Sequence, residues 1–261
     1  MHAALYISKT GLSAQDTRLA AISNNLANVG TTGFKKDRVV FEDLLYQIQR
    51  QPGANSSQNT ELPSGLQVGT GVRVTGSQKL FNQGSLQTTG EALDIGINGR
   101  GFFEIVMPDG SSAYSRDGQF HMSANGEIVT ATGHMLNPGL TVPADAQTIT
   151  VGNDGVVTAR IAGQNEPVNI GNLNLVDFIN PAGLQALGGN LYSETVSSGN
   201  PQQSAPGQNG MGQLVQGALE SSNVEVVEEL VDMITTQRAY EMNSKVISTA
   251  DQMLQFITQN L

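Results

Sequence analysis

Apolar residues recur every seven positions at both ends of the chain, and this spacing restricts the fold more than any other feature. A seven-residue spacing keeps a narrow apolar stripe facing a partner helix while both helices supercoil. The sequence therefore predicts long terminal helices that pair as a coiled-coil-like module. The N-terminal stripe contains Leu5, Leu12, Leu19 and Leu26, with Ile22 and Val29 at the alternate position. The C-terminal stripe contains Val226, Met233, Tyr240, Ile247, Leu254 and Leu261.

The two ends also carry opposite charge. Residues 1–36 are basic and residues 223–261 are acidic, and this difference favours their association. An exposed ion pair contributes only about 0.3–0.5 kcal/mol, so charge assists pairing without determining it. The basic set is Lys9, Arg18, Lys35 and Lys36 against Asp16. The acidic set is Glu225, Glu228, Glu229, Asp232, Glu241 and Asp251 against Arg238 and Lys245.

Composition argues against several classes of function. The net charge of −10 and the absence of a Lys/Arg cluster argue against binding to nucleic acid. No stretch approaches the roughly 18 apolar residues of a membrane-spanning helix, so we expect no membrane insertion. The N-terminus lacks the charged and apolar regions of a secretory signal, and we expect export without a cleaved signal peptide. The absence of cysteine excludes disulfides and cysteine-ligated metal.

The first helix is expected from about Ala3 to Val29. It should end at Gly30, because glycine readily adopts the left-handed conformation that caps a helix. Asn24, Asn25 and Asn28 crowd the last turn, although asparagine is a poor helix former. Their amides can hydrogen-bond to other chains, which indicates specific contacts. Simple fraying toward the cap is the alternative explanation of the same residues.

The middle of the chain combines two polar tracts with short strand signals. Residues 49–71 and 197–212 are rich in Gln, Pro, Gly, Ser and Asn, which predicts connectors. Between them, apolar or alternating segments such as 102–106, 127–130 and 155–158 predict an antiparallel β-domain. Turn dipeptides that favour tight hairpins separate these segments. They are Asp109-Gly110, Asp117-Gly118, Asn125-Gly126 and Asp154-Gly155.

The last helix should begin near Ser222 or Asn223. Ser222 and Glu225 have the spacing of a capping box, and Glu228 and Glu229 suit the positive end of a helix. Neither Gly nor Pro follows before the end of the sequence, so a helix over residues 223–261 would be about 60 Å long.

These elements predict an α+β chain with three parts. Residues 1–33 and 223–261 form a discontinuous helical core, because two connectors are needed when one domain is inserted into another. Residues 34–74 form an extended, stiffening connector. Residues 75–222 form the inserted antiparallel β-domain, which includes the polar linker 197–212.

No residue pattern indicates catalysis, a cofactor or a metal. His2, His121 and His134 are not paired with other ligands at metal-binding spacing. The short glycine repeats at 69–71 and 99–101 do not open a helix after a strand, which indicates turns or bulges. The clustered carboxylates lie at a predicted helix start rather than in an acid and base pair. We therefore predict a protein that is not an enzyme.

The residues predicted to carry function are those that would join subunits. Tyr240 lies on the C-terminal stripe beside Gln237 and Arg238, so an aromatic anchor is flanked by hydrogen-bond donors, as at protein interfaces. A solvated helix face with one buried tyrosine has the same spacing. The candidate assembly residues are Leu5, Leu12, Leu19, Asn24, Asn25, Leu26, Asn28, Phe34, Met233, Gln237, Arg238, Tyr240, Asn243, Ile247 and Leu254.

Long motifs at both ends of the chain resemble the flagellar axial proteins, the rod and hook family. The N-terminal motif is NNLANVGTTGFKK at 24–36, and the C-terminal motif is NVEVVEELVDMITTQRAYEMNSKVISTADQML at 223–254. The central segment adds GRGFFEI at 99–105, YSRDGQF at 114–120, NGEIVTATG at 125–133 and NLYSET at 190–195. The resemblance covers nearly the whole chain.

The resemblance implies a helical polymer that acts as a drive shaft through the periplasm. It also implies contacts with proximal rod proteins, the hook protein and the P and L rings, and export through the flagellar type III apparatus. The terminal helices would surround the export channel, with the β-domain outside. Chain size and segment 41–72, which would pack between neighbours, favour the distal rod over a proximal-rod relative of similar length.

Two other classes of function stay open from the residues alone. A secreted β-domain on a closed coiled-coil stalk would act as an adhesin and form small discrete oligomers. A β-domain that cuts peptidoglycan lacks a credible acid and base pair. In every case, the free energy gained by burying two narrow apolar stripes is smaller than the conformational entropy cost of ordering two long helices. We therefore expect both helical ends to be largely disordered in the free subunit.

Overall fold

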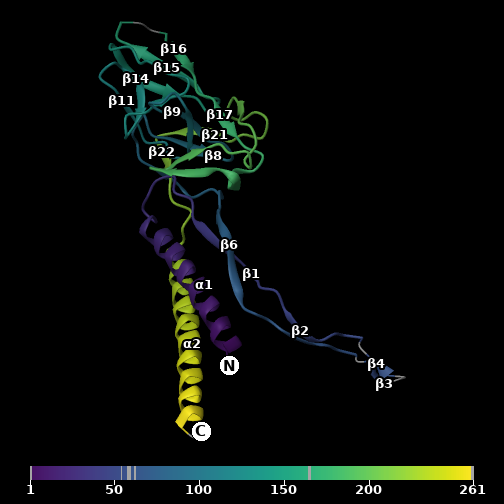
Figure 1. The fold of residues 1–261 in the computed structure, drawn as a ribbon. Helices are drawn as coiled ribbons and strands as arrows, with labels where there is room; N and C mark the ends of the chain where they lie inside the picture. Colours follow the sequence, from purple (N-terminus) through teal and green to yellow (C-terminus); the bar gives the residue numbers. More distant parts are fainter. Residues whose placement is uncertain (1, 54, 58–59, 62, 164–165, 260–261) are drawn as a thin grey trace. The chain divides into compact units, whose positions relative to one another are not determined.

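The computed structural model describes residues 2–53, 55–57, 60–61, 63–163 and 166–259 (Figure 1). The chain divides into two compact units, each built from distant parts of the sequence. The helical unit consists of Met1–Leu26, Asp37–Gln78 and Glu225–Leu261. The β-unit consists of Ala27–Lys36 and Lys79–Val224. Residues 37–78 thus belong with the helices, whereas the predicted scheme treats residues 34–74 as a part of their own.

Helix α1 spans His2–Ala27, close to the predicted range. The expected left-handed cap at Gly30 is wrong, because the first glycine after α1 with positive φ is Gly33, at 68°. A side chain at Gly33 would collide with backbone, since its Cβ would lie 2.7 Å from the Asp117 nitrogen. Gly33 also donates its backbone N–H to the Glu220 carbonyl at 2.8 Å. Glycine is required there for close packing inside the β-unit.

Helix α2 spans Val226–Gln259. It begins after the predicted start, and the expected capping box is wrong, because Ser222 Oγ accepts a hydrogen bond from Val224 N in a local turn at 3.3 Å. Glu228 and Glu229 occupy the first turn of α2, as predicted. Leu261, the last residue of the predicted stripe, lies outside the described residues.

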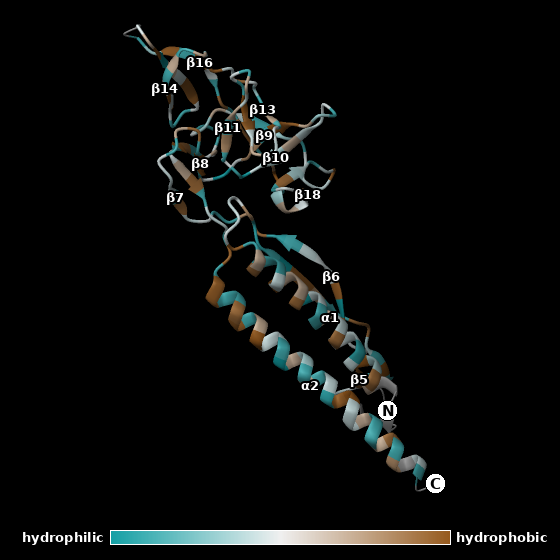
Figure 2. Ribbon diagram, turned by 90° about the vertical axis from the view of Figure 1, so that its left-hand side faces the viewer, coloured by the Kyte–Doolittle hydropathy of each residue, from teal (hydrophilic) through white to brown (hydrophobic). Residues whose placement is uncertain are grey.

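Helices α1 and α2 lie side by side in the helical unit and run antiparallel (Figures 1 and 2). Arg18 Nη2 lies 3.4 Å from Asp232 Oδ2, and a Cβ built on Gly11 would lie 3.2 Å from the Asn243 side chain. Position numbers therefore rise along α1 as they fall along α2. The buried positions of the described helices are Ser8, Ala14, Ile22, Asn25, Glu229, Thr236 and Ala250, and all except Ile22 carry small or polar residues.

Residues 37–79 form paired strands rather than a plain connector. Strand β1 (Asp37–Asp43) pairs with β6 (Val72–Lys79). Farther along, β2 (Gln47–Arg50) pairs antiparallel with β5 (Leu66–Val68), and β3 (Asn55–Ser57) pairs with β4 (Thr60–Glu61). Strand pairing satisfies backbone polar groups without an apolar core, so the polar composition does not prevent it. Residues 54, 58–59 and 62 of the predicted connector lie outside the described residues.

The β-unit contains the predicted antiparallel β-structure. Its largest sheet has seven strands in the order β11, β12, β13, β9, β10, β19 and β18. These strands span Phe120–Met122, Ile128–Thr130, Met135–Leu136, Phe103–Val106, Ser112–Ser115, Leu191–Ser193 and Gln185–Gly188. A second sheet contains β14 (Ala146–Val151), β15 (Val156–Ile161) and β16 (Val168–Asn172). Three antiparallel pairs complete the unit: β7 (Leu86–Thr88) with β22 (Ala218–Glu220), β8 (Ile95–Asn98) with β21 (Gln213–Gln216), and β17 (Leu175–Asp177) with β20 (Gln202–Ser204).

Three of the four predicted turns are present. Gly110, Gly126 and Gly155 adopt φ of 83°, 82° and 90° between paired strands. The predicted hairpin at Asp117-Gly118 is wrong, because β10 and β11 are not neighbours in the sheet. Gly118 instead lets two backbones approach, since its carbonyl accepts a hydrogen bond from Ile95 N at 3.0 Å.

Two larger apolar clusters form the core of the β-unit, beside a small third cluster of Ile105, Ala113 and Leu191. The larger includes Ile95, Ile97, Phe103, Val157 and Leu214, all with no exposed side-chain surface. The smaller joins four rings edge to face, Phe102, Tyr114, Phe178 and Tyr192, with Tyr114 and Phe178 centroids 4.8 Å apart. Burial raises the pKa of the Tyr114 hydroxyl to about 12. The packing of aliphatic and aromatic side chains in these clusters forms a core without tryptophan.

The polar tract 197–212 is folded into the β-unit. Strand β20 pairs with β17, Ser198 has no exposed surface, and Met211 packs in the larger cluster at 8% exposure. Side-chain hydrogen bonds replace apolar packing, since Ser198 Oγ donates to the Thr195 carbonyl and accepts from Thr195 N. The chain leaves the β-unit after Val224, beyond this tract.

Replacing Gly118 by alanine should destabilise the β-unit. The added Cβ would lie 1.8 Å from the Ile95 carbonyl oxygen, which belongs to backbone and cannot move aside. We expect a loss of about 1–3 kcal/mol in the free energy of unfolding, measured by urea denaturation. Gly139→Ala is the matched control, because no atom lies within 4 Å of its Cβ and the variant should be nearly neutral. Equal stability of the two variants would contradict the packing role of Gly118.

Candidate subunit interface and its buried anchor

The predicted assembly residues of α1 lie mostly at partly covered positions. Leu5, Leu12, Leu19 and Leu26 are half-buried, whereas Asn24 is exposed. Because large side chains are only partly covered within the subunit, they retain apolar surface for another helix. Lateral contact with neighbouring subunits would complete their burial.

Asn25 connects three segments of the helical unit. It is 2% exposed, and its Nδ2 donates to the Asp37 carbonyl at 3.0 Å and to Glu229 Oε2 at 3.3 Å. Its Oδ1 accepts a hydrogen bond from Asp37 N at 2.9 Å. The amide therefore serves contacts inside the chain, joining α1 to α2 and to the start of β1. A role of Asn25 in assembly would act through this positioning.

The predicted assembly residues of α2 divide between two sides of the helix. Met233, Asn243, Ile247 and Leu254 are half-buried on the side that carries the buried Thr236 and Ala250. Gln237 and Arg238 are exposed, and Tyr240 is 41% exposed, so its ring is only partly covered within the subunit. The structure brings no second chain to Tyr240, and its role as an anchor remains a prediction.

An apolar patch that the heptad analysis largely missed covers the start of α2. We call Val227, Leu230, Val231 and Ile234 the outer patch; their exposures are 68%, 42%, 54% and 49%. On an α-helix these positions lie away from Glu229 and Thr236, which are buried. Figure 2 colours this part of α2 as hydrophobic. Apolar residues three and four positions apart are the sequence signal for this patch. The seven-residue repeat instead follows the neighbouring stripe of α2.

A second feature missed by the sequence analysis is a buried ion cluster of Lys35, Glu220 and Arg116, here called the Lys35 cluster. Lys35 Nζ lies 2.6 Å from Glu220 Oε1, and neither side chain is exposed. Arg116 Nη1 lies 3.5 Å from Glu220 Oε2. Burial lowers the pKa of Lys35 and of Arg116, and the Glu220 carboxylate opposes both shifts. No spacing rule could find a pair separated by so many residues.

Hydrogen bonds extend the Lys35 cluster to nearby backbone. Lys35 Nζ donates to the Asn82 carbonyl at 2.8 Å, Gly84 N donates to Glu220 Oε1 at 2.8 Å, and Arg116 Nη2 donates to the Gly99 carbonyl at 2.8 Å. A buried charge is tolerated only when partners of this kind surround it. The cluster thereby fixes residues 33–36 to the rest of the β-unit, although the sequence analysis predicted an assembly role for Phe34. Phe34 is itself 8% exposed, with Lys79 Nζ 5.3 Å from its ring centroid.

Asn223 reinforces the same region of the β-unit. Its Oδ1 accepts from Lys36 N at 2.8 Å, and its Nδ2 donates to the Leu80 carbonyl at 2.7 Å. These contacts join three segments, 27–36, 79–84 and 218–224. Each of these segments leads along the chain to the helical unit. The expected role of Asn223 at the start of α2 is therefore replaced by a role in bracing the exits from the β-unit.

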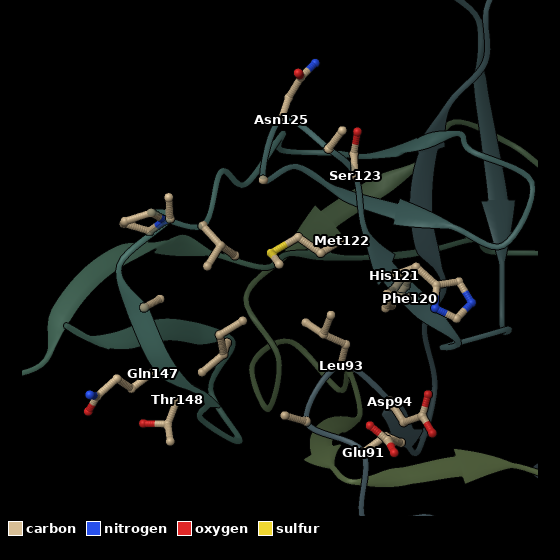
Figure 3. Close-up of a pocket in the computed structure, with 18 residues that line it drawn as sticks. Glu91, Leu93, Asp94, Phe120, His121, Met122, Ser123, Asn125, Gln147 and Thr148 are labelled. Carbon is tan, nitrogen blue, oxygen red and sulfur yellow. The ribbon is translucent and has the colours of Figure 1, made fainter. Parts of the chain in front are cut away.

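One hollow of the described structure lies in the β-unit. Its volume is about 810 Å³, and it lies between β11, the following hairpin and β14. Figure 3 shows Leu93 and Met122 pointing into the hollow, with Glu91, Asp94 and His121 to one side and Asn125 at the tip of the hairpin. The described residues contain no group of His, Cys, Asp and Glu that could hold a metal ion. Leu93 and Met122 give the hollow an apolar floor.

Neither helix in the described ranges is long and apolar enough to cross a membrane. Helix α2 is long, but charged and polar residues are distributed along it.

Three family models match separate parts of the chain. The flagella basal body rod protein model matches residues 5–35, and the flagellar hook protein FlgE/F/G D1 domain model matches residues 96–159. The flagellar basal body rod FlgEFG protein C-terminal model matches residues 215–260. The first and third include α1 and α2, and the second lies within the β-unit. These matches follow the division between terminal helices and central β-structure.

Whole-chain similarity extends to flagellar basal-body rod proteins named FlgG. The chain is 54% identical to the protein of Buchnera aphidicola subsp. Schizaphis graminum, with 98% of each chain covered. Identity is 53% to the protein of Buchnera aphidicola subsp. Acyrthosiphon pisum, again with 98% of each covered. It is 46% to the protein of Borreliella burgdorferi, with 97% of each covered. None of these descriptions names an enzyme.

Removing the carboxylate of the Lys35 cluster should strongly destabilise the β-unit. Glu220→Gln leaves two buried cations without their counter-charge, and breaking such a pair costs about 3–5 kcal/mol. Urea denaturation of the full chain measures the change. Glu91→Gln is the control, because Glu91 is an exposed carboxylate of the same unit and its loss should change stability by less than about 0.5 kcal/mol. Similar losses in both variants would show that the burial of the cluster has no special role.

Hydrogen exchange of the dilute subunit should separate residues 33–36 from the helices. We expect protection at Gly33 and Lys36, whose backbone N–H groups are bonded to Glu220 and Asn223, and rapid exchange at residues 5–26 and 226–254. Glu220→Gln should raise exchange at 33–36 without slowing it in the helices. Strong protection of either helix in the monomer would contradict assembly-dependent folding.

Proposed function

This chain belongs to the FlgG family of flagellar basal-body rod proteins, and from that premise we propose how it serves as a structural subunit of the distal rod. Subunits assemble through their terminal helices into a helical tube, which transmits torque to the hook and encloses the export channel. The outer patch of α2 is the observation that carries this proposal. Four clustered apolar side chains, each at least 42% exposed, are unfavourable on an isolated subunit and suit a helix buried by neighbours.

The way α1 meets α2 supports a lateral role for the large apolar residues. Small or polar residues such as Ser8, Thr236 and Ala250 occupy most of the fully buried positions, and small side chains let helices approach closely. The heptad leucines of α1 are therefore left at the flanks. Neighbouring helices would cover both flanks and the outer patch, which extends the predicted coiled-coil pairing beyond one subunit.

The paired strands of residues 37–79 offer a second assembly surface. Leu45, Tyr46, Ile48 and Leu66 have exposures of 89%, 53%, 57% and 52%. A two-stranded ribbon with exposed apolar side chains is only marginally stable alone and gains from packing on other chains. This supports the expected packing of segment 41–72 between neighbouring subunits, where it would stiffen the tube.

We extend the proposal to the partners expected of a distal rod. The tube would follow the proximal rod proteins, continue into the hook protein and turn inside the P and L rings as it crosses the periplasm. The flagellar type III apparatus would deliver the subunits. A terminal helical unit that folds only on assembly suits this delivery, because an extended chain must reach the growing end before it orders.

A lysine in the outer patch should block assembly without harming the subunit. We expect Val231→Lys to keep the unfolding transition of the β-unit, because Val231 is 54% exposed in the helical unit. Burial of a lysine between helices is costly, so tubes should be lost. Electron microscopy and sedimentation at rising concentration measure assembly, with a fragment of the tube as seed to remove the nucleation barrier.

The matched control places the same change on the β-unit. Ala131→Lys alters an exposed hairpin turn and should leave tube formation intact. Tubes from Val231→Lys would exclude the outer patch from the interface. Discrete small oligomers from the unaltered seeded protein would reject the polymer and favour the stalked binding module.

A further inference from the structure

The chain contains three Asn-Gly pairs, and their local structures differ. They are Asn98-Gly99 at the end of β8, Asn125-Gly126 in the β11–β12 hairpin and Asn209-Gly210 in the loop between β20 and β21. All three asparagines are exposed, so access of water does not distinguish them. In such a pair, the backbone nitrogen of glycine can attack the side-chain amide carbon of asparagine. The availability of that nitrogen therefore decides which pair reacts.

Two of the pairs have an engaged glycine nitrogen. Gly99 N donates to Gln83 Oε1 at 2.9 Å, and Gln83 Nε2 also lies 3.3 Å from Asn98 Oδ1, so one side chain holds both reacting groups. Gly126 N donates to the Ser123 carbonyl at 2.9 Å in the hairpin turn that Figure 3 shows. Both sites are also crowded. A Cβ built on Gly99 would lie 2.7 Å from Gly212 Cα, and one on Gly126 would lie 2.5 Å from the Val142 carbonyl oxygen.

The third pair, Asn209-Gly210, has a glycine nitrogen that donates no hydrogen bond among the described residues, and there is open space around the glycine. Among the hydrogen bonds of the described residues, none uses the Gly210 nitrogen as donor. No atom lies within 4 Å of a Cβ built on Gly210, so the ring that forms during attack has room. Asn209 Nδ2 donates to Ser204 Oγ at 3.0 Å, which holds the amide beside a hydroxyl that can supply a proton to the departing nitrogen. The residues on both sides are anchored by Pro206 and Met211, which are buried.

We propose that Asn209 is a site of spontaneous deamidation in the folded protein. The Gly210 nitrogen loses its proton and bonds to Asn209 Cγ, the Cγ–Nδ2 bond breaks, and Nδ2 leaves as ammonia. Water then opens the resulting succinimide at either carbonyl, which leaves aspartate or isoaspartate at position 209. No oxidant, metal or enzyme is needed, and the net change is the replacement of the side-chain NH2 group by an OH group.

The modification would change the β-unit in two ways. It adds one negative charge to a chain whose net charge is already −10. Isoaspartate also inserts an extra backbone carbon at residue 209, two residues before Met211, which is 8% exposed in the larger core cluster. The altered loop would loosen the start of β21, where Gln213 pairs with Asn98. Subunits would thus accumulate a local defect with age.

Peptide mapping of the full-length protein tests the site. The protein is incubated at mildly alkaline pH in buffer and in denaturant, and conversion of each Asn-Gly pair is followed by mass spectrometry and isoaspartyl methyltransferase labelling. In buffer, Asn209 should convert at least about fivefold faster than Asn98 or Asn125, the ratio that one ordinary hydrogen bond represents. In denaturant the three rates should become similar.

Two variants test the cause. Gln83→Ala removes the acceptor of the Gly99 nitrogen and should accelerate conversion at Asn98 while leaving Asn209 unchanged. Asn209→Gln should abolish labelling in the 205–211 loop and keep it at the other pairs. Conversion in the folded protein that is as fast at Asn98 or Asn125 as at Asn209 would overturn the proposal, as would an absence of conversion at Asn209. Tube assembly is not the readout, so failure here is distinct from failure of the rod function.

Discussion

The Lys35 to Glu220 ion pair is the contact on which the organisation of this chain depends. Both side chains are fully buried at 2.6 Å, and Arg116 adds a second cation at 3.5 Å. A buried pair adds little net stability compared with apolar packing, but losing one partner is very costly. The pair therefore acts mainly by specifying structure. It forces residues 33–36 to fold with the β-unit, and with Asn223 it braces the places where the chain leaves that unit.

Outside the β-unit, the chain shows a different balance of forces. Most fully buried positions of α1 and α2 are small or polar, so much of their large apolar surface remains exposed. The ribbon of β1, β2, β5 and β6 likewise keeps exposed side chains such as Leu45 and Tyr46. We therefore expect the β-unit to be stable alone and the helical unit to gain most of its stability from neighbours. Such a division would suit the rod assembly proposed for this chain.

Local signals in the sequence predicted the type of most elements. The heptads gave both helices, and Asn125-Gly126 and Asp109-Gly110 gave hairpins, because a turn dipeptide and a periodic stripe act within a few residues. The predictions were wrong where the conformation of a residue depends on a contact with a residue far away in the sequence. Gly118 resembles a turn glycine but packs against Ile95. Ser222 resembles a helix cap, but the next residue, Asn223, hydrogen-bonds to Lys36 and Leu80 of the β-unit.

The sequence by itself determined the α+β class, the antiparallel insert and the family, since each depends on periodicity or on long contiguous motifs. Only the tertiary structure decided which residues have contacts inside the subunit and which remain for assembly. Asn25 and Phe34, predicted to join subunits, are buried within one, whereas Val227 and Val231 are exposed. The physical reason is that burial of a side chain depends on what the fold brings from far along the chain, as Glu220 is brought to Lys35.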